Sequence, residues 1–203
     1  KNCFLAGNPV RWDISNGDRM TAAQLFDLNA DKKTLFIFGG SQGSEALNKC
    51  TKGMINYLNE VQLLWQTGKS NIDKYEQFET DSVRVVPFID DMKSAYALSD
   101  LSFSRAGALT IAELTSCGLP SILVPLPSAA ADHQTHNGQS MVDAGAAELI
   151  PEAELDSKKT SEKIVSLMND ENALNKMTSK SKQLGKPNAV NVIVDQIMEK
   201  VND

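Results

Sequence analysis

Six short apolar runs alternate with longer segments of helical spacing, and this alternation limits the fold of the 203-residue chain more than any other feature. The runs are continuously apolar, as expected for strands that are buried on both faces of a sheet. In chain order they are TLFIF (34–38), VQLLWQ (61–66), VRVVPF (83–88), LSFS (101–104), SILVP (121–125) and AELI (147–150). Helical spacing occupies residues 44–59, 71–79, 91–99, 109–117 and 134–144. The pattern predicts the α/β class, with a Rossmann-like, doubly wound parallel sheet covered by helices.

Glycine and proline residues mark where these elements end. Pro87 predicts that the third strand stops there, because proline has no N–H to donate to a neighbouring strand. Gly118 followed by Pro120 predicts a helix end, and a second Gly and Pro pair precedes a last helix that Asn188 can cap. The apolar residues of that last helix recur on one face, which predicts that the face packs on something: Val190, Ile193, Val194, Ile197 and Val201.

Three regions follow from this organisation. Residues 1–30 are a turn-rich hinge segment, residues 31–150 form the Rossmann-like core, and residues 151–203 form a helical tail. Residues 151–187 are polar and are expected to form solvated helices with no sign of a site. The opening KNCFLAGNPVR has neither an initiator Met nor the features of a signal peptide, so we expect a fragment of a longer protein.

The composition is that of an ordinary globular protein, and it excludes several functions. A net charge of −6 disfavours general nucleic-acid binding, which needs a basic surface. No apolar run approaches the ~20 residues that span a bilayer. Cys3, Cys50 and Cys117 lie far apart without a CxxC pair, which favours a reducing compartment and predicts that all three are buried or half-buried.

The loop after the first predicted strand, FGGSQGSEALN (38–48), is the first candidate site. Its glycines would let backbone N–H groups approach a phosphate at the start of the next helix. The sequence matches neither the GxGxxG dinucleotide motif nor the P-loop, which disfavours a dinucleotide enzyme and an ATPase. A tight strand-to-helix turn without any ligand explains the same glycines.

The second candidate site is SRAGALTIAE (104–113), where small residues precede a predicted helix. Gly107, Ala108, Leu109 and Thr110 would offer free N–H groups to a diphosphate, with Arg105 just before them. Glu113 could accept hydrogen bonds from a ribose diol. The alternative for Glu113 is an acid that the helix dipole favours near its amino end.

The third candidate site is ADHQTHN (131–137), which contains both histidines of the chain. Gln134 and Asn137 suit sugar hydroxyls. His133 and His136 have no Cys partner and no HExxH pattern, and no Asp-x-Asp motif is present to hold a metal on a diphosphate. We therefore expect no metal site. A serine hydrolase is also unsupported, because the chain has no Gly-x-Ser-x-Gly.

Several segments together resemble the MurG family of bacterial transferases, from about residue 6 to the end: AGNPVR, FGGSQGSEALN, WQTGK, VVPFIDDM, SRAGALTIAE, GLPSILVPLP, DHQTHN and DAGAA. Members of this family add N-acetylglucosamine from UDP-N-acetylglucosamine (UDP-GlcNAc) to a lipid-linked muramyl-pentapeptide in peptidoglycan synthesis. The resemblance implies the C-terminal, donor-binding half of a two-domain GT-B glycosyltransferase.

The resemblance also implies roles for single residues. Arg11 matches a donor-site position, and the backbone of Ile89 matches the group that reads the uracil edge. Gly40, Ser41 and Gln42 match the loop at the diphosphate. The remaining matches are the helix start with the ribose acid and the amides of the sugar loop: Ala108, Leu109, Thr110, Glu113, Gln134 and Asn137. The family often has a pair of amides or DDHQ in this loop, whereas alanines precede Asp132 here, so the detailed sugar contacts stay open.

The implied reaction is an inverting displacement that uses no metal and no cofactor, with the general base in the absent N-terminal half. We expect this chain to bind donor but to transfer no sugar, and the membrane contact at the cytoplasmic face of the inner membrane to belong to the other half. Three alternatives remain: the catalytic subunit of a two-subunit UDP-GlcNAc transferase, a UDP-sugar epimerase domain, and a nucleotide-sensing module.

Overall fold

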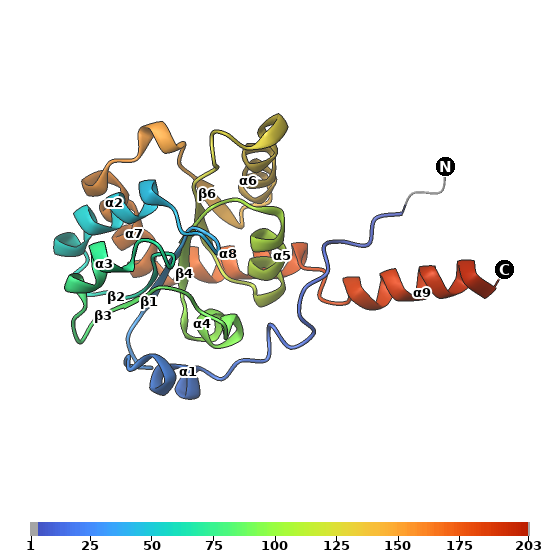
Figure 1. Cartoon of the computed structure of the whole chain (residues 1–203), viewed down its shortest axis with the longest axis horizontal. Helices are drawn as coiled ribbons and strands as arrows, with labels where there is room; N and C mark the ends of the chain where they lie inside the picture. The colour runs from blue at the N-terminus through green and yellow to red at the C-terminus, as the bar shows by residue number, and fades with distance from the viewer. Residues whose placement is uncertain (1–3, 203) are drawn as a thin grey trace.

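A six-stranded, fully parallel sheet forms the centre of the computed structural model, which describes residues 4–202 (Figure 1). The strand order is β3-β2-β1-β4-β5-β6, so the order reverses between β1 and β4. The strands are β1 (Thr34–Phe38), β2 (Gln62–Gln66), β3 (Val83–Val86), β4 (Leu101–Ser104), β5 (Ser121–Leu123) and β6 (Ala147–Leu149). Each of the six predicted strands is therefore confirmed, and β3 ends directly before Pro87.

The helices alternate with the strands as the sequence predicts. They are α1 (Arg19–Phe26), α2 (Glu45–Met54), α3 (Ile72–Tyr75), α4 (Met92–Leu98), α5 (Ala108–Cys117), α6 (His133–Asp143), α7 (Ser157–Asn169), α8 (Glu171–Leu184) and α9 (Ala189–Asn202). Short 3₁₀ turns occupy Ile55–Tyr57, Glu76–Phe78, Ala130–Asp132 and Glu152–Glu154. Gly118 closes α5 in the left-handed conformation, with φ of 70°, as its position before Pro120 predicts.

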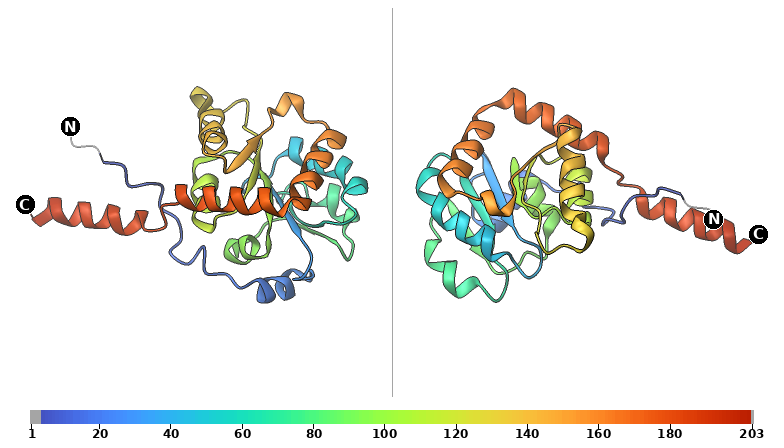
Figure 2. Two further views of the ribbon diagram at one scale, coloured as in Figure 1. Left: turned by 180° about the vertical axis from the view of Figure 1, so that it is seen from behind. Right: turned by 90° about the horizontal axis from the view of Figure 1, so that it is seen from above.

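The sheet is buried on both faces, which explains why its strands are continuously apolar. Phe36 and Phe38 of β1 point into one core, which α1, α4, α5 and α6 cover. Leu35 and Ile37 point into the other core, to which α2, α3 and α7 contribute buried residues. Figure 2 shows helices on both sides of the sheet. The polar region after residue 150 contributes to this second core through Ile164, so its helices are not simply solvated.

Helix α1 is an element that the sequence analysis missed, because it lies in the segment described as turn-rich. Asp18 caps it by accepting a hydrogen bond from the Thr21 N–H at 2.8 Å. Its buried residues are two alanines and Phe26, which give a weak apolar stripe. Arg19 holds the helix in place by pairing with Asp100 at 2.9 Å.

Helix α9 extends away from the domain (Figure 1), which differs from the expectation that its apolar face packs on something. Val194 is 49% exposed and Ile197 is 56% exposed. Phe4 of the N-terminal segment lies against the same helix, beside Ile193 and Ile197. The apolar face is thus present as predicted, but within residues 4–202 it has little cover.

The structure bears on two of the three cysteines. Cys50 is buried and Cys117 is partly buried, and both are free thiols, as expected. Cys3 lies outside the described residues.

Candidate nucleotide-sugar site

A cavity opens at the carboxyl ends of β1, β4 and β5, beside the point where the strand order reverses. In doubly wound sheets this is the usual position for a ligand. The loop after β1, the starts of α2 and α5, the loop before α6 and the turn after β6 supply its walls. The lining residues are Gly39, Gly40, Gly43, Ser44, Glu45, Ala46, Arg105, Gly107, Thr110, Leu126, Gln134 and Glu152.

The glycine loop after β1 folds into a tight turn at the edge of this cavity. The Gly43 N–H donates to the Gly40 carbonyl at 3.0 Å. Gly43 has φ of 76°, and a Cβ there would lie 2.0 Å from the Thr67 carbonyl oxygen, so only glycine fits. Gly40 has φ of 87°, but a Cβ there would have no atom within 4 Å, because this position faces open space. The exposed side chains of Ser41 and Gln42 form the tip of the turn.

Helix α5 begins at this cavity without a side-chain cap. Helices α1, α2, α4, α7 and α8 each begin with an Asp or Ser side chain that accepts a backbone N–H, whereas α3 and α6, like α5, have no side-chain cap. In α5 that position is Gly107, which makes no such bond. The first N–H groups of the helix, at Ala108, Leu109 and Thr110, therefore lack a side-chain acceptor at the cap. This arrangement confirms the expected bare helix start and suits an anion.

Arg105 lies in the wall of the cavity, but its guanidinium is already engaged. Nη1 donates to the carbonyls of Val124 and Pro125 at 3.2 and 3.0 Å, and Nη2 donates to Ser44 Oγ at 2.8 Å. Nη2 also pairs with the Glu152 carboxylate. Arg105 therefore differs from the free cation that the sequence suggests, and the cavity contains a protein carboxylate close to it.

The two amides of the third candidate site lie in different places. Gln134 lines the cavity, and its Oε1 accepts the Leu126 N–H at 3.0 Å. The Nε2 group is therefore the part of this amide that can donate to a ligand. Asn137 donates to the Ala106 carbonyl at 3.2 Å and lines a neighbouring pocket between α5 and α6. In this geometry Asn137 ties α6 to the start of α5.

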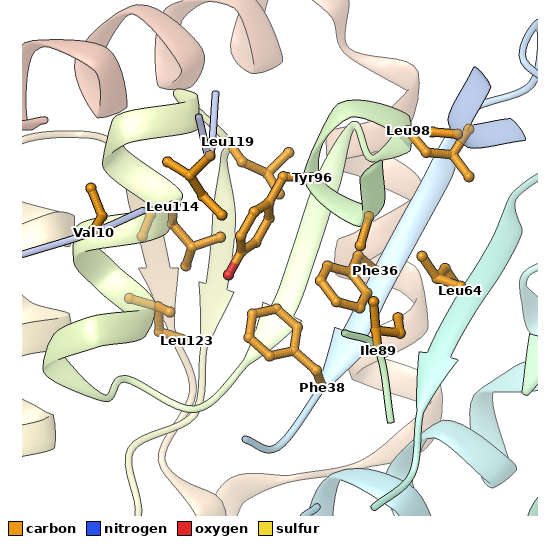
Figure 3. Packing of buried hydrophobic residues seen from close by; sticks show 14 of the residues in the cluster. Val10, Phe36, Phe38, Leu64, Ile89, Tyr96, Leu98, Leu114, Leu119 and Leu123 are labelled. Atoms are coloured by element: carbon orange, nitrogen blue, oxygen red, sulfur yellow. The ribbon is translucent and has the colours of Figure 1, made fainter. Parts of the chain in front are cut away.

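Glu113 lies in α5, outside the residues that line the cavity, and is only 9% exposed. One of its carboxylate oxygens accepts the Tyr96 hydroxyl at 2.8 Å. The Tyr96 ring stands between Leu114 and the phenyl rings of Phe36 and Phe38, and it meets both phenyl rings edge-on (Figure 3). The core thus fixes the position of the Glu113 carboxylate.

Burial and the Glu113 charge also control the titration of two neighbours. Burial first, and the charge of Glu113 second, raise the pKa of Tyr96 well above its ordinary value. The same two causes raise the pKa of the Cys117 thiol to about 12. Both groups are therefore neutral at pH 7, and Tyr96 remains a hydrogen-bond donor to Glu113.

Arg11 and Ile89 come together on the segment that follows β3. Arg11 Nη1 donates to the Asp90 carbonyl at 3.0 Å, which holds the exposed hinge segment against this loop. The Ile89 side chain is buried in the core, and its N–H donates to Gln66 Oε1 at 2.8 Å. Arg11 therefore contacts the residue next to Ile89, and neither Arg11 nor Ile89 lines the cavity.

The predicted site residues therefore divide into groups. Gly40, Arg105, Gly107, Thr110 and Gln134 line one cavity with other glycines of the 38–48 loop, whereas the other predicted residues lie around it or on neighbouring segments. Sequence reasoning included Ser44 only as part of the 38–48 loop, without a role of its own, and it missed Glu152. Glu152 lies in the turn after β6, separated from Leu149 by Ile150 and Pro151, so inspection of the residues after every strand would have found it. The expectation that residues 151–187 show no sign of a site is wrong at this position.

Metal-ligating side chains are not grouped anywhere in the part of the chain that the structure describes, counting sets of three or more His, Cys, Asp or Glu. His133 and His136 are both exposed, and His133 Nδ1 lies 2.8 Å from the Ala130 carbonyl oxygen. None of the helices described over residues 4–202 is both long and apolar enough to cross a membrane.

A doubly wound parallel sheet with a glycine-lined cavity at its switch point defines the class of Rossmann-like nucleotide-binding domains. The model of the glycosyltransferase family 28 C-terminal domain matches residues 34–193, and the chain belongs to this family. It has the fold of the C-terminal domain of a GT-B glycosyltransferase.

Similar proteins agree with this family. The chain is 40% identical to the UDP-N-acetylglucosamine--N-acetylmuramyl-(pentapeptide) pyrophosphoryl-undecaprenol N-acetylglucosamine transferase of Flavobacterium psychrophilum, over 98% of this chain and 55% of that protein. It is 38% identical to the transferase of the same name from Finegoldia magna, over 95% of this chain and 54% of the relative. The crystal structure of Acinetobacter baumannii MurG superposes with a TM-score of 0.78 at 32% identity, covering 92% of this chain and 54% of that one. The chain thus spans about half the length of the curated relatives it matches.

Proposed function

We propose that this chain is the donor-binding half of an inverting transferase that moves N-acetylglucosamine from UDP-GlcNAc to undecaprenyl-pyrophosphoryl-N-acetylmuramyl-pentapeptide in peptidoglycan synthesis. The observation that carries the proposal is the uncapped start of α5 at Gly107, which opens into the glycine-lined cavity. The names of the relatives supply the identity of donor and acceptor.

The start of α5 would stabilise the UDP leaving group. A diphosphate there would accept hydrogen bonds from the N–H groups of Ala108, Leu109 and Thr110, and it would gain ~0.3–2 kcal/mol from the helix dipole. The glycine turn at Gly40 would close on it from the opposite wall. Because charge accumulates on the diphosphate as the sugar leaves, these fixed donors would act most strongly in the transition state. No metal is needed for this stabilisation.

The neighbouring residues would bind the rest of the donor. Uracil would lie at the backbone of Ile89, the ribose at Glu113, and the sugar near Gln134. Arg11 would hold the loop after β3, since it already donates to the Asp90 carbonyl. Because the guanidinium of Arg105 is paired with Glu152, it would contribute less positive potential to the diphosphate site than a free cation.

The acceptor and the general base would belong to a second domain, consistent with relatives about twice as long as this chain. The exposed apolar face of α9 and the nearby Phe4 would pack on that domain. Contact with the lipid acceptor at the cytoplasmic face of the inner membrane would then be peripheral and would involve that domain.

A labelling assay tests the proposal. UDP-GlcNAc with a labelled sugar and the lipid-linked acceptor are incubated with this chain alone, and with this chain fused behind the N-terminal half of the Flavobacterium psychrophilum relative. We expect label in a lipid-linked product from the fusion only. Transfer by the isolated chain would contradict the division into halves, and formation of a 2-epimer of the free nucleotide sugar would indicate an epimerase instead.

A further inference from the structure

Gln66 joins the two loops that border the site, although these loops follow strands that are not neighbours in the sheet. Gln66 is the last residue of β2, which lies between β1 and β3, and it pairs with Phe38 and Val86. Its Nε2 donates to the Gly40 carbonyl at 3.1 Å, and its Oε1 accepts the Ile89 N–H at 2.8 Å. A single amide therefore bonds the glycine loop on one side and the loop after β3 on the other.

The burial of Gln66 makes this bridge a fixed feature rather than a surface contact. The residue is 3% exposed, so both ends of its amide need protein partners. Thr67, the next residue, also packs against the glycine loop, because its carbonyl oxygen lies where a Cβ of Gly43 would be. The Ile89 N–H is already engaged by Gln66. The Ile89 carbonyl is therefore the backbone group that could hydrogen-bond to a nucleotide base.

We propose that Gln66 is a positioning residue that sets the distance between the loop receiving the diphosphate and the loop receiving the base. The proposal rests on the proposed function, because it assumes a uridine diphosphate in this site. The Ile89 carbonyl can accept the N3–H of uracil, whereas N3 of cytosine is itself an acceptor. By fixing this peptide group, Gln66 would support both affinity for UDP and its discrimination from CDP.

Two substitutions separate the two bonds. In Gln66→Glu, a carboxylate oxygen can still accept the Ile89 N–H, but the donor to Gly40 is lost. We expect UDP affinity to fall by tenfold or more, because a donor is lost and the new carboxylate oxygen faces the Gly40 carbonyl, while the ratio of UDP to CDP affinity stays unchanged. In Gln66→Leu both bonds are lost, so UDP affinity and the UDP to CDP ratio should both fall.

Gln62 provides a matched control at the opposite end of the same strand. It is 1% exposed, and its side-chain amide accepts the Asn29 N–H and donates to Thr34 Oγ1. Gln62→Leu removes a buried amide of the same kind, so it should lower thermal stability to an extent similar to Gln66→Leu. Its ratio of UDP to CDP affinity should match the unsubstituted chain.

Titration calorimetry of the four proteins with UDP and CDP, beside thermal unfolding, gives the answer. A change in the ratio for Gln66→Leu but not for Gln62→Leu supports the proposal. Unchanged affinity and ratio in both Gln66 variants would overturn it, as would an equal loss in Gln62→Leu. An unsubstituted chain that is folded but does not bind UDP would instead overturn the proposed function itself.

Discussion

Among single residues, Glu113 connects the core to the site most directly, because its carboxylate accepts the buried Tyr96 hydroxyl while the proposed function places it at the ribose. Its place in the second turn of α5 keeps it close to the helix start, where the diphosphate would lie. A charged acceptor in a site of this kind binds a diol more strongly than a neutral one.

Glu113→Gln should therefore weaken UDP binding by roughly 10- to 100-fold, the range for hydrogen bonds to a charged group. The glutamine oxygen can still accept from Tyr96, so the melting temperature should change little. Titration calorimetry checks the affinity. The control is Tyr96→Phe, which removes the hydroxyl but leaves the carboxylate, and an equal loss of affinity in both variants would count against a direct role for Glu113.

Glu152 brings a negative charge into the cavity that is proposed to receive a diphosphate. Its partner Arg105 also has Ser44 and two backbone carbonyls as acceptors, so the guanidinium stays engaged without it. Glu152→Gln should strengthen UDP binding by roughly threefold to tenfold, because it removes repulsion in a partly buried site. The measurement is the affinity for UDP over a range of salt concentrations. Glu154→Gln, on the same turn, is the control and should have a smaller effect. Weaker binding in Glu152→Gln would show that the carboxylate supports the site.

On the scale of elements, helix α5 is the clearest example of a structure shaped for an anion. Gly107 has φ of −65°, which any residue can adopt, and a Cβ there would lie 3.5 Å from Thr110 Oγ1, an ordinary contact. Stability alone would therefore favour Ser or Asp at this position.

Gly107→Asp should change stability and binding in opposite directions. The new carboxylate would cap α5 and add a few tenths to about 1 kcal/mol to the free energy of unfolding. It would also occupy the anion position, so UDP affinity should fall by tenfold or more. Gly107→Ala is the control for the added Cβ. Loss of stability in Gly107→Asp, or unchanged UDP affinity, would contradict an anion site at this helix start.

The strands could be predicted from the sequence because burial on both faces requires consecutive apolar residues, as in residues 34–38. The uncapped start of α5 could also be predicted, since it depends on a glycine next to a helical pattern. Helix α1 was not, because its few small apolar residues give a weak periodic signal. The pair of Arg105 with Glu152 depends on β6 lying at the sheet edge, and such tertiary contacts have no local sequence signature.

On the scale of the whole molecule, the two ends of the described chain lie beside each other and outside the domain (Figure 2). The domain has cores on both faces of its sheet, so it does not need α9 for its own packing. The apolar face of α9 is then best explained by contact with the proposed second domain.

Replacing both Val194 and Ile197 by Asp tests this explanation. In the present chain both side chains are about half exposed, so the free energy of unfolding should change by less than about 0.5 kcal/mol. In the fusion with the N-terminal half of the relative, the same change should lower the melting temperature and the transfer rate. Glu199→Ala, on the same helix, is the control. A large loss of stability in the chain alone would contradict the explanation.

We propose that the uncapped start of α5 belongs to a preformed nucleotide-sugar site, and calorimetric titration of this chain is the decisive experiment. UDP-GlcNAc, UDP-GalNAc and GDP-mannose are titrated with and without EDTA, into the unsubstituted chain and into Gly107→Asp. We expect UDP-GlcNAc to bind in preference to GDP-mannose, EDTA to have no effect, and Gly107→Asp to weaken binding. A folded chain that binds none of the three, or that binds only when a metal is present, would contradict it.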